Sequence, residues 1–453
     1  MYIIFFTMKI NPKIAFLSSF IFFFFPVNQL YAQQKMSLQA CIDFALENSY
    51  AVNQKILENE FNMIQLNARK TSIAPSLGAN IGQTFDFGRS NMPDNTTVST
   101  SQAITNFGVG LNMDIFQGLR THHQIEADKL NLQATLFDIE TAKENIELAV
   151  TAYYLQILLN KEILEVYKAQ VVLDMLQTDR IEVLVKNGKS SDTELYVAKS
   201  TLATDQVAVV EAQNNVRLSL LDLAQLMNFT DVANFEIDAE NDFAYIDKIL
   251  DKNVDLNLVT ENALQNRPSI QAALVRIEQA KRSVKISRAG WYPTLSLSAS
   301  FGTNYFYDFK KNSGVSKPFG TQFKDFARES VGFSLYIPIF DKLNTHYNVN
   351  QQKVNIKMQQ LQFDETKRKL IKEIEQAYVS AVASKEKFLA SQIAYTSSQI
   401  AFQYEEIKYN AGASTNYEFN EAKNRYLKAQ SNLIQAKFDF LFRVKILEFY
   451  GKN

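Results

Sequence analysis

The stretch RAGWYPTLSLSASFG (288–302) contains the only Trp of the chain, then a Pro, and then a strict alternation of residue types. Four apolar residues share one face of this predicted strand, namely Leu295, Leu297, Ala299 and Phe301. Thr and Ser alternate with them, so the opposite face is polar, which is typical of a strand with one wet side. A closely similar phrase, RKTSIAPSLGANIG, occupies 69–82, so the chain makes the same element twice.

The whole chain is an internal duplication. An offset of 218 residues aligns Pro75 with Pro293, and an offset of 224 aligns Gly188 with Gly412 and Glu194 with Glu418. The offset changes between the two strands of each copy, where loops differ in length. We infer one unit of about 190–200 residues, present twice.

Each unit has the predicted order helix, strand, strand, long helix, helix. In the first copy a helix covers 37–73, strands cover 76–88 and 102–116, and helices cover about 119–187 and 192–228. In the second copy the strands are 294–307 and 330–340, and the helices run over about 343–411 and on to about 450. The long helices carry a heptad-like apolar seam, which predicts antiparallel coiled coils roughly 100 Å long. The loops 89–101 and 308–329 are polar.

The sequence before and between the repeats predicts a signal peptide and a linker. Residues 1–32 have two lysines, an apolar run and a small-residue cleavage site, which predict a secretory signal peptide rather than the alternative, a membrane anchor. The first repeat is then 33–228 and the second 257–453, with an acidic linker or equatorial segment at 229–256.

Composition excludes several classes of protein. Gly (14) and Pro (8) are scarce among 453 residues, which favours long helices, and a formal net charge of −1 gives no support for a nucleic-acid partner. The single cysteine, Cys41, cannot form an intrachain disulfide and is expected to be a small buried residue. After the signal, no apolar run is long enough for a transmembrane helix.

The strands fit a membrane better than a soluble sheet. Their length suits tilted membrane-spanning strands, and a face of Ser, Gly, Asn and Thr suits a wet lumen. Aromatic residues at the strand ends predict an interfacial girdle that includes Trp291, Tyr292, Phe116 and Phe340. Four strands cannot close a barrel, and open edges are not tolerated in lipid, so several chains must share one barrel.

At this point the sequence strongly resembles the TolC-like outer membrane efflux protein family (outer membrane factors). The resemblance covers essentially all of 36–451 and rests on ordered, duplicated features: SLQACIDFALENS (37–49), the AP-S-L and YP-T-L strand starts, DIFQG (114–118), PIFDK (338–342), and the Gly-containing turns 187–192 and 410–416.

The resemblance implies a mainly α protein with a membrane β part. Four strands per chain enter a shared 12-stranded barrel of a homotrimer in the outer membrane of a Gram-negative bacterium, and the coiled-coil helices form a periplasmic α-barrel. The implied function is a passive exit duct of a tripartite efflux or type I secretion system. Its partners are outer-membrane lipid, a periplasmic adaptor and an inner-membrane pump, with no cofactor.

The resemblance also implies a constriction at the periplasmic end. Glu418 and Glu421 are three residues apart, so they share a helix face, and they match acids that line the family's constriction. Tyr409 and Glu194 match residues of the network that keeps it closed. The acids here are Glu rather than Asp, and Ser414 replaces a gating Arg of some members. The alternative for these acids is an ordinary solvated helix face.

The helical turns are expected to be adaptor-docking tips, because their small residues allow a close approach; the alternative is plain turn chemistry. The tip residues are Asn187, Gly188, Lys189, Ser190, Ala411, Gly412, Ala413 and Ser414.

Enzymatic and metal-binding constellations are missing from the sequence. His122, His123 and His346 are more typical of polar interfaces than of a metal site, and no catalytic triad or phosphate loop is present, so we expect neither an enzyme nor a metal. The remaining alternative is a secreted coiled-coil envelope protein with a structural or binding role and no pore.

Overall fold

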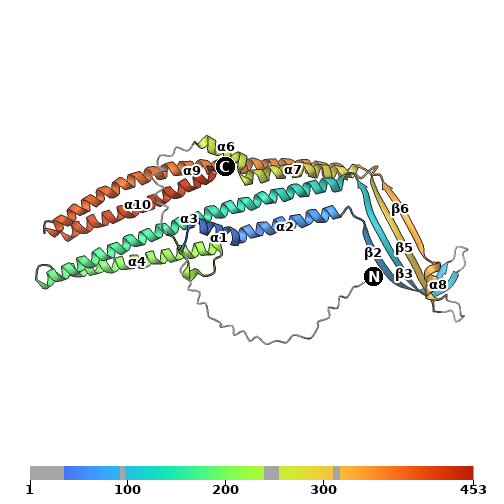
Figure 1. Cartoon of the computed structure of the whole chain (residues 1–453), viewed down its shortest axis with the longest axis horizontal. Helices are drawn as coiled ribbons and strands as arrows, with labels where there is room; N and C mark the ends of the chain where they lie inside the picture. The colour runs from blue at the N-terminus through green and yellow to red at the C-terminus, as the bar shows by residue number, and fades with distance from the viewer. Residues whose placement is uncertain (1–34, 92–96, 239–254, 310–316, 452–453) are drawn as a thin grey trace, which may run out of the picture.

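The computed structural model describes residues 35–91, 97–238, 255–309 and 317–451. The molecule is elongated, with a sheet at one end, two helical turns at the other, and long helices between them (Figure 1). The expected signal peptide at 1–32 lies outside the described residues, as does most of the acidic segment 229–256, so both stay predictions.

The first helical stretch of each repeat is broken at one matched position. In place of a single helix over 37–73, the chain forms α1 (Leu38–Asn48) and α2 (Tyr50–Thr71), because Ser49 is extended with a ψ of 128°. In the second repeat Arg267 is extended with a ψ of 130° between α6 (Leu256–Asn266) and α7 (Pro268–Arg288). There the proline that follows disfavours a helical backbone at Arg267.

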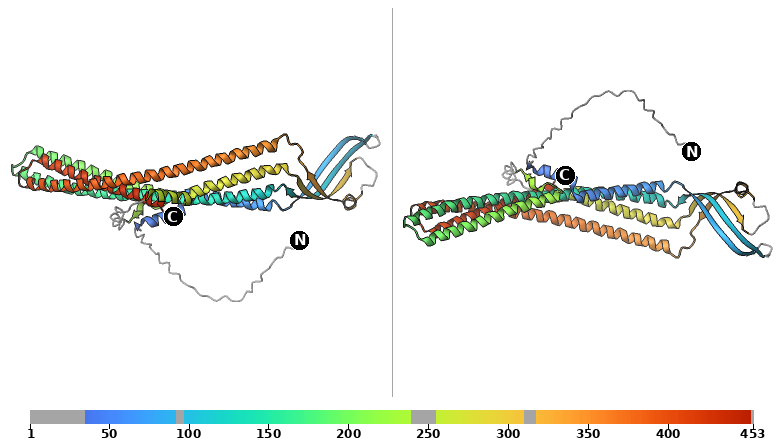
Figure 2. Two further views of the ribbon diagram at one scale, coloured as in Figure 1. Left: turned by 90° about the horizontal axis from the view of Figure 1, so that it is seen from above. Right: turned by 90° about the horizontal axis from the view of Figure 1, so that it is seen from below.

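Two long antiparallel hairpins make up most of the molecule. The first consists of α3 (Arg120–Lys186) and α4 (Asp192–Met227), and the second of α9 (Asn344–Asn410) and α10 (Asn416–Gly451). The lengths match between the repeats, with 67 residues in α3 and α9 and 36 in α4 and α10. Helix α7 packs against both α3 and α9, and the two hairpins lie together at the tip (Figure 2).

The strands form one antiparallel sheet in the order β2–β3–β5–β6. These strands are β2 (Ser76–Asn91), β3 (Thr97–Gln117), β5 (Thr294–Asp308) and β6 (Arg328–Tyr336). The central pair, β3 and β5, joins the two repeats, with Val109 opposite Phe301. Within the described chain, β2 and β6 each have one neighbour in the sheet and therefore one free edge.

The sheet and its loops differ from the sequence prediction in three places. Strand β6 ends at Tyr336 instead of residue 340, and Pro338, which has no N–H to give to a ladder, lies two residues farther on. The expected polar loop 308–329 contains a short helix, α8 (Phe319–Asp325), which lies against β5. Strands β2 and β3 extend farther into the loop between them than predicted.

The main hydrophobic core lies midway along the molecule. Helices α1, α3, α4 and α10 meet there with a small parallel pair, β1 (Lys35–Met36) and β4 (Glu236–Ile237). Cys41 is fully buried in this core, and burial raises the pKa of its thiol to about 12. After the short helix η1 (Val232–Asn234), Phe235 and Ile237 enter the core, so the acidic segment begins as part of the packed structure.

The WYP sequence lies where helices give way to strands. The 3-10 helix η3 (Ala289–Trp291) ends α7, and β5 begins at Thr294. The end of β3 packs closely against it: Gly118 has a φ of +59°, and a Cβ there would lie 2.7 Å from the Tyr292 Cβ. The WYP sequence before β5, in the second repeat, therefore packs closely against the DIFQG sequence at the end of β3, in the first repeat.

Candidate functional site

The two turns at the tip are built in the same way. Gly188 has a φ of +68° and Gly412 a φ of +71°, a conformation that glycine adopts at low cost. The amide of Lys189 donates to the Leu184 carbonyl at 2.8 Å, and the Ala413 amide donates to the Lys408 carbonyl at 2.8 Å. These are Schellman turns, which end a helix with its last carbonyls satisfied.

Glu418 closes the second turn. Its carboxylate accepts hydrogen bonds from the Thr415 amide at 2.9 Å, the Thr415 hydroxyl at 2.8 Å and the Ser414 hydroxyl at 3.2 Å. The Glu418 amide donates back to the Thr415 hydroxyl at 3.2 Å, which completes a capping box. The hydrogen bonds from Thr415 and then Ser414 lower the pKa of Glu418, so this acid is held as an anion at the start of α10.

Glu194 and Glu421 also have partners within the chain. The Ser190 hydroxyl donates to Glu194 at 2.5 Å, and the Glu194 amide donates to the Ser191 hydroxyl at 3.3 Å. Glu421 forms an ion pair with Arg425 at 2.7 Å, with both side chains largely exposed. Of the two acids expected to share a face of α10, Glu418 is therefore hydrogen-bonded within the turn, and Glu421 is paired with a cation.

Tyr409 joins the two hairpins. Gln177 on α3 donates to the Tyr409 hydroxyl at 3.0 Å and to the Asn416 side chain at 3.1 Å. The Tyr409 ring stacks on Phe419 with centroids 4.7 Å apart, and the Arg180 guanidinium lies 5.0 Å from its centroid. Burial, and then the charge of Glu194, raises the pKa of Tyr409. Tyr409 is therefore hydrogen-bonded to Gln177, whereas the charge of Glu194 acts on Tyr409 electrostatically.

The sequence analysis missed a buried ion pair beside this network. Lys423 on α10 bonds Asp174 on α3, and the two side chains are only 2% and 4% exposed. Gln170 donates to Asp174 at 3.0 Å and to Asp205 on α4 at 3.0 Å. Burial raises the pKa of Asp174 to about 6, outweighing the hydrogen bond from Lys423. This cluster connects three helices through charged and polar groups.

The tip residues therefore fall into two sets. The turn residues of both hairpins are exposed or half-buried at the very end of the molecule, beyond the packed part (Figure 2). The bonded residues line a hollow of about 160 Å³ between α3, α9 and α10, which includes Asp174, Gln177, Arg180, Tyr409, Phe419 and Lys423. The helix caps at Ser191 and Thr415 had a sequence signal, Ser or Thr three residues before Glu, whereas Lys423 looks like any other helical lysine.

The expected girdle lies at the helix–sheet junction. Trp291 and Tyr292 precede β5, and Phe116 on β3 is opposite Leu295. Phe340 follows the end of β6 and is 76% exposed. All four aromatic residues expose at least two-fifths of their surface at one end of the sheet.

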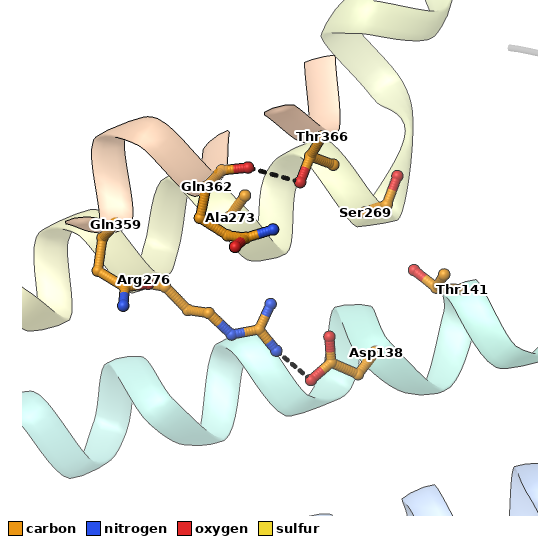
Figure 3. A pocket seen from close by; sticks show the side chains of 8 residues that line it. All are labelled: Asp138, Thr141, Ser269, Ala273, Arg276, Gln359, Gln362 and Thr366. Carbon is orange, nitrogen blue, oxygen red and sulfur yellow. Dashed lines mark hydrogen bonds and ion pairs between the residues drawn. The ribbon is translucent and has the colours of Figure 1, made fainter. Parts of the chain in front are cut away.

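A second hollow, of about 200 Å³, lies between α3, α7 and α9 (Figure 3). Its walls are polar, and Arg276 pairs with Asp138 across it. Elsewhere, His346 shares a hydrogen bond of 2.9 Å with Asn350. Across the described ranges, no group of three or more His, Cys, Asp or Glu side chains is placed to hold a metal ion.

These features define a class of protein: a duplicated chain with long helical hairpins at one end and an apolar-faced sheet at the other, the architecture of solved outer-membrane channels. In the part of the chain that the structure describes, no helix has the length and apolarity to cross a membrane.

The chain belongs to the outer membrane efflux protein family, whose family model matches residues 42–228 and 259–443. It is similar to the toxin and drug export protein A of Aggregatibacter actinomycetemcomitans, with 24% identity over 368 residues, 80% of this chain and 76% of that protein. The outer membrane protein TolC of Escherichia coli is 21% identical over 382 residues, 83% of this chain and 74% of that protein.

The fold is also that of solved channels. The crystal structure of the Campylobacter jejuni CmeC outer membrane channel matches with a TM-score of 0.76 at 19% identity, over 91% of this chain and 85% of that one. The TolC-like family, the mainly helical fold with its strands, and the outer-membrane location predicted from the sequence are confirmed.

Proposed function

We propose that three copies of this chain form an outer-membrane channel-tunnel, the passive exit duct of an efflux or type I secretion system. The observation that carries the proposal is the open sheet. Both of its edge strands expose apolar side chains: Leu77 and Ile81 on β2 are 72% and 74% exposed, and Val331 and Phe333 on β6 are 71% and 70% exposed.

An open edge with this composition requires other copies. In lipid every backbone group must be bonded within the protein, so a sheet with two free edges has to be closed. The smallest usual barrel has eight strands, and three copies of a four-stranded sheet give 12, enough for a hollow interior. The long hairpins of three copies then form the periplasmic tunnel.

The exposed turns are the proposed docking tips for a periplasmic adaptor, which links the tunnel to an inner-membrane pump. Support comes from their position at the end of the molecule and from small residues such as Gly188, Ala411 and Ala413. A photoreactive residue at Ala413, introduced in the native bacterium, is expected to crosslink the adaptor. The same residue at exposed Tyr50, near the middle of the molecule, serves as the control.

The proposed constriction consists of Glu418, Glu421, Tyr409 and Glu194, a set supported by its position within a few turns of the tip. Glu421 pairs with Arg425, which partly offsets its charge within each copy, whereas Glu418 stays an anion held by neutral hydrogen-bond donors. We propose that the pump, rather than this ring, selects the cargo.

A pair of neighbouring substitutions tests the channel. Leu297 and Ser298 lie on opposite faces of β5, so a lysine at 297 would face lipid, at a cost of about 2–4 kcal/mol near the midplane, and one at 298 would face water. We expect Leu297→Lys to lose trimers in mild detergent, measured by light scattering. Ser298→Lys should assemble and change single-channel conductance in planar bilayers. A monomer without conductance in the unmodified chain would favour the envelope protein without a pore.

A further inference from the structure

Helix α8 is fixed to the far end of the sheet, opposite the helical tunnel (Figure 1). Phe319 packs edge-on against Phe107 and Tyr305, with centroids 6.0 and 5.3 Å apart, and Phe323 packs against Phe107 at 5.8 Å. The Thr303 hydroxyl donates to the Phe323 carbonyl at 2.8 Å, and Thr303 is only 2% exposed. The helix therefore has a defined seat on β3 and β5.

Gln322 holds this seat by acting as a substitute strand partner. Strand β6 pairs with β5 only as far as Gly302. Beyond that point the Phe306 amide donates to the Gln322 side chain at 2.9 Å, and the Gln322 side chain donates to the Phe306 carbonyl at 3.1 Å. Because Gln322 is buried, these bonds set the height of α8 along β5.

The helix lies on the apolar face of the sheet. Side chains two residues apart on a strand share a face, so Thr303 and Tyr305 share one with Leu297 and Phe301. Phe107, which the helix also contacts, lies opposite Thr303 on β3. Under the proposed function this face meets lipid, and the inference rests on that assignment.

The height of α8 corresponds to the upper limit of the apolar band. That band is about 25 Å tall, and strands tilted by about 40° with a rise of about 3.3 Å cross it in roughly ten residues. Ten residues from Leu295 end at Asn304, beside the seat of the helix. The outer side of α8 carries Thr321, Lys324 and Asp325, all exposed.

A group of aromatic residues lies across the sheet at the same height as α8. Phe309 stacks on Phe85 and Phe87, with centroids 6.4 and 6.0 Å apart, and meets Tyr307 edge-on at 5.2 Å. These four rings are each about half exposed or more, on the apolar face. Rings of this kind gather where acyl chains meet headgroups.

We propose that α8 and the rings of Phe85, Phe87, Tyr307 and Phe309 form an outer collar that binds the headgroup layer of the outer leaflet. The rings lie at the boundary between acyl chains and headgroups, and Lys324 faces lipid phosphates. The other lysine near α8, Lys317, pairs with Asp325 at 2.5 Å. The collar fixes how far the sheet enters the membrane, because it ends the apolar face with a polar helix surface.

Single-Trp reporters test this position. In a Trp291→Phe background, tryptophan is placed at Thr321, on the outer side of α8, and at Leu297 and Ser298 as references. Each protein is inserted into phosphatidylcholine and phosphatidylglycerol vesicles with nitroxides either at the headgroup or in mid-chain. We expect headgroup nitroxide to quench Thr321→Trp at least about twofold more than mid-chain nitroxide, and Leu297→Trp to show the reverse.

The references separate the two proposals. If Leu297→Trp is quenched in mid-chain and Thr321→Trp is quenched only by aqueous iodide, the sheet is in lipid but the collar is refuted. If Thr321→Trp is quenched best in mid-chain, the collar is also refuted. If Leu297→Trp and Ser298→Trp do not differ in lipid quenching, the proposed channel fails and the collar fails with it.

Charge supplies a second measurement. Headgroup quenching of Thr321→Trp is expected to rise with the phosphatidylglycerol fraction, and Lys324→Glu should abolish that rise. Lys367→Glu, exposed on α9 in the helical part of the molecule, is the matched control and should preserve it. An unchanged rise in Lys324→Glu would overturn the assignment of Lys324 to lipid phosphate.

Discussion

Replacing Lys423 with Met should loosen the contact between the two hairpins. Methionine keeps most of the side-chain length and removes the charge, so Asp174 is left buried without its cation. Asp174 retains the hydrogen bond from Gln170, but its second oxygen loses its partner. The defect is an uncompensated buried charge, with little change in packed volume.

The expected cost is about 3–5 kcal/mol, the usual range for removing one partner of a buried pair. Since about 1.4 kcal/mol is a factor of ten, local opening should increase by roughly two to three and a half decades. The pKa of Asp174 is already raised to about 6 with Lys423 present, so the orphaned carboxyl will take up a proton near neutral pH. The cost should therefore be larger at pH 8 than at pH 6.

Hydrogen exchange of peptides from α3 and α10 around these residues measures that opening directly. Lys199→Met is the matched control, because Lys199 occupies the equivalent repeat position and is exposed, so it should change exchange by less than about threefold. The double variant Lys423→Met, Asp174→Leu should recover most of the protection, since an apolar replacement of a buried pair is often neutral. Equal exchange in Lys423→Met and Lys199→Met would refute a buried pair at this position.

Three further predictions concern the tip. Because the pKa of Asp174 is raised from 3.8 to about 6, folding takes up a proton between these two pH values. Relative to Asp174→Asn, the wild type should therefore become more stable as the pH falls from about 6 to about 4. Unfolding in detergent at each pH measures this, and a stability difference that does not change with pH would contradict it. Arg425→Ala removes the partner of Glu421 and should raise cation preference in reversal-potential measurements, whereas an unchanged potential would place both outside the constriction. Thr415→Ala removes the cap that Glu418 shares and should destabilise the α10 start by about 1 kcal/mol, seen as faster exchange there, with Thr396→Ala on the exposed side of α9 as control.

Periodicity and repetition predicted the large elements well. Alternation over 294–307 and heptads over 119–187 are local patterns, and they place β5 and α3 to within a residue or two. The two offsets also predicted matched turns, and Gly188 and Gly412 adopt the same left-handed backbone. These features depend on residues that are close in sequence, so they can be predicted from the sequence alone.

Features that depend on distant partners were not predictable. Lys199 and Lys423 match in the repeat, yet Lys199 is exposed, whereas Lys423 is buried and paired with the buried Asp174 on α3. Helix α8 begins directly after Pro318 and contains Gly320, and it forms against β5 through Gln322 rather than through its own propensity. Nothing in either local sequence specifies the partner.

The two hairpins have equal lengths and similar caps, but they are not held alike, and this asymmetry constrains how the tip can widen. The second hairpin is tied to α3 by a buried ion pair, Asp174–Lys423, and by three further polar contacts, Gln177–Tyr409, Gln177–Asn416 and Arg180–Asn410. Separating α9 and α10 from α3 breaks all four contacts together and returns the buried pair to water. Moving both hairpins of one copy as a single body breaks none of them. In the proposed channel these contacts therefore oppose widening within a copy and do not oppose widening between copies.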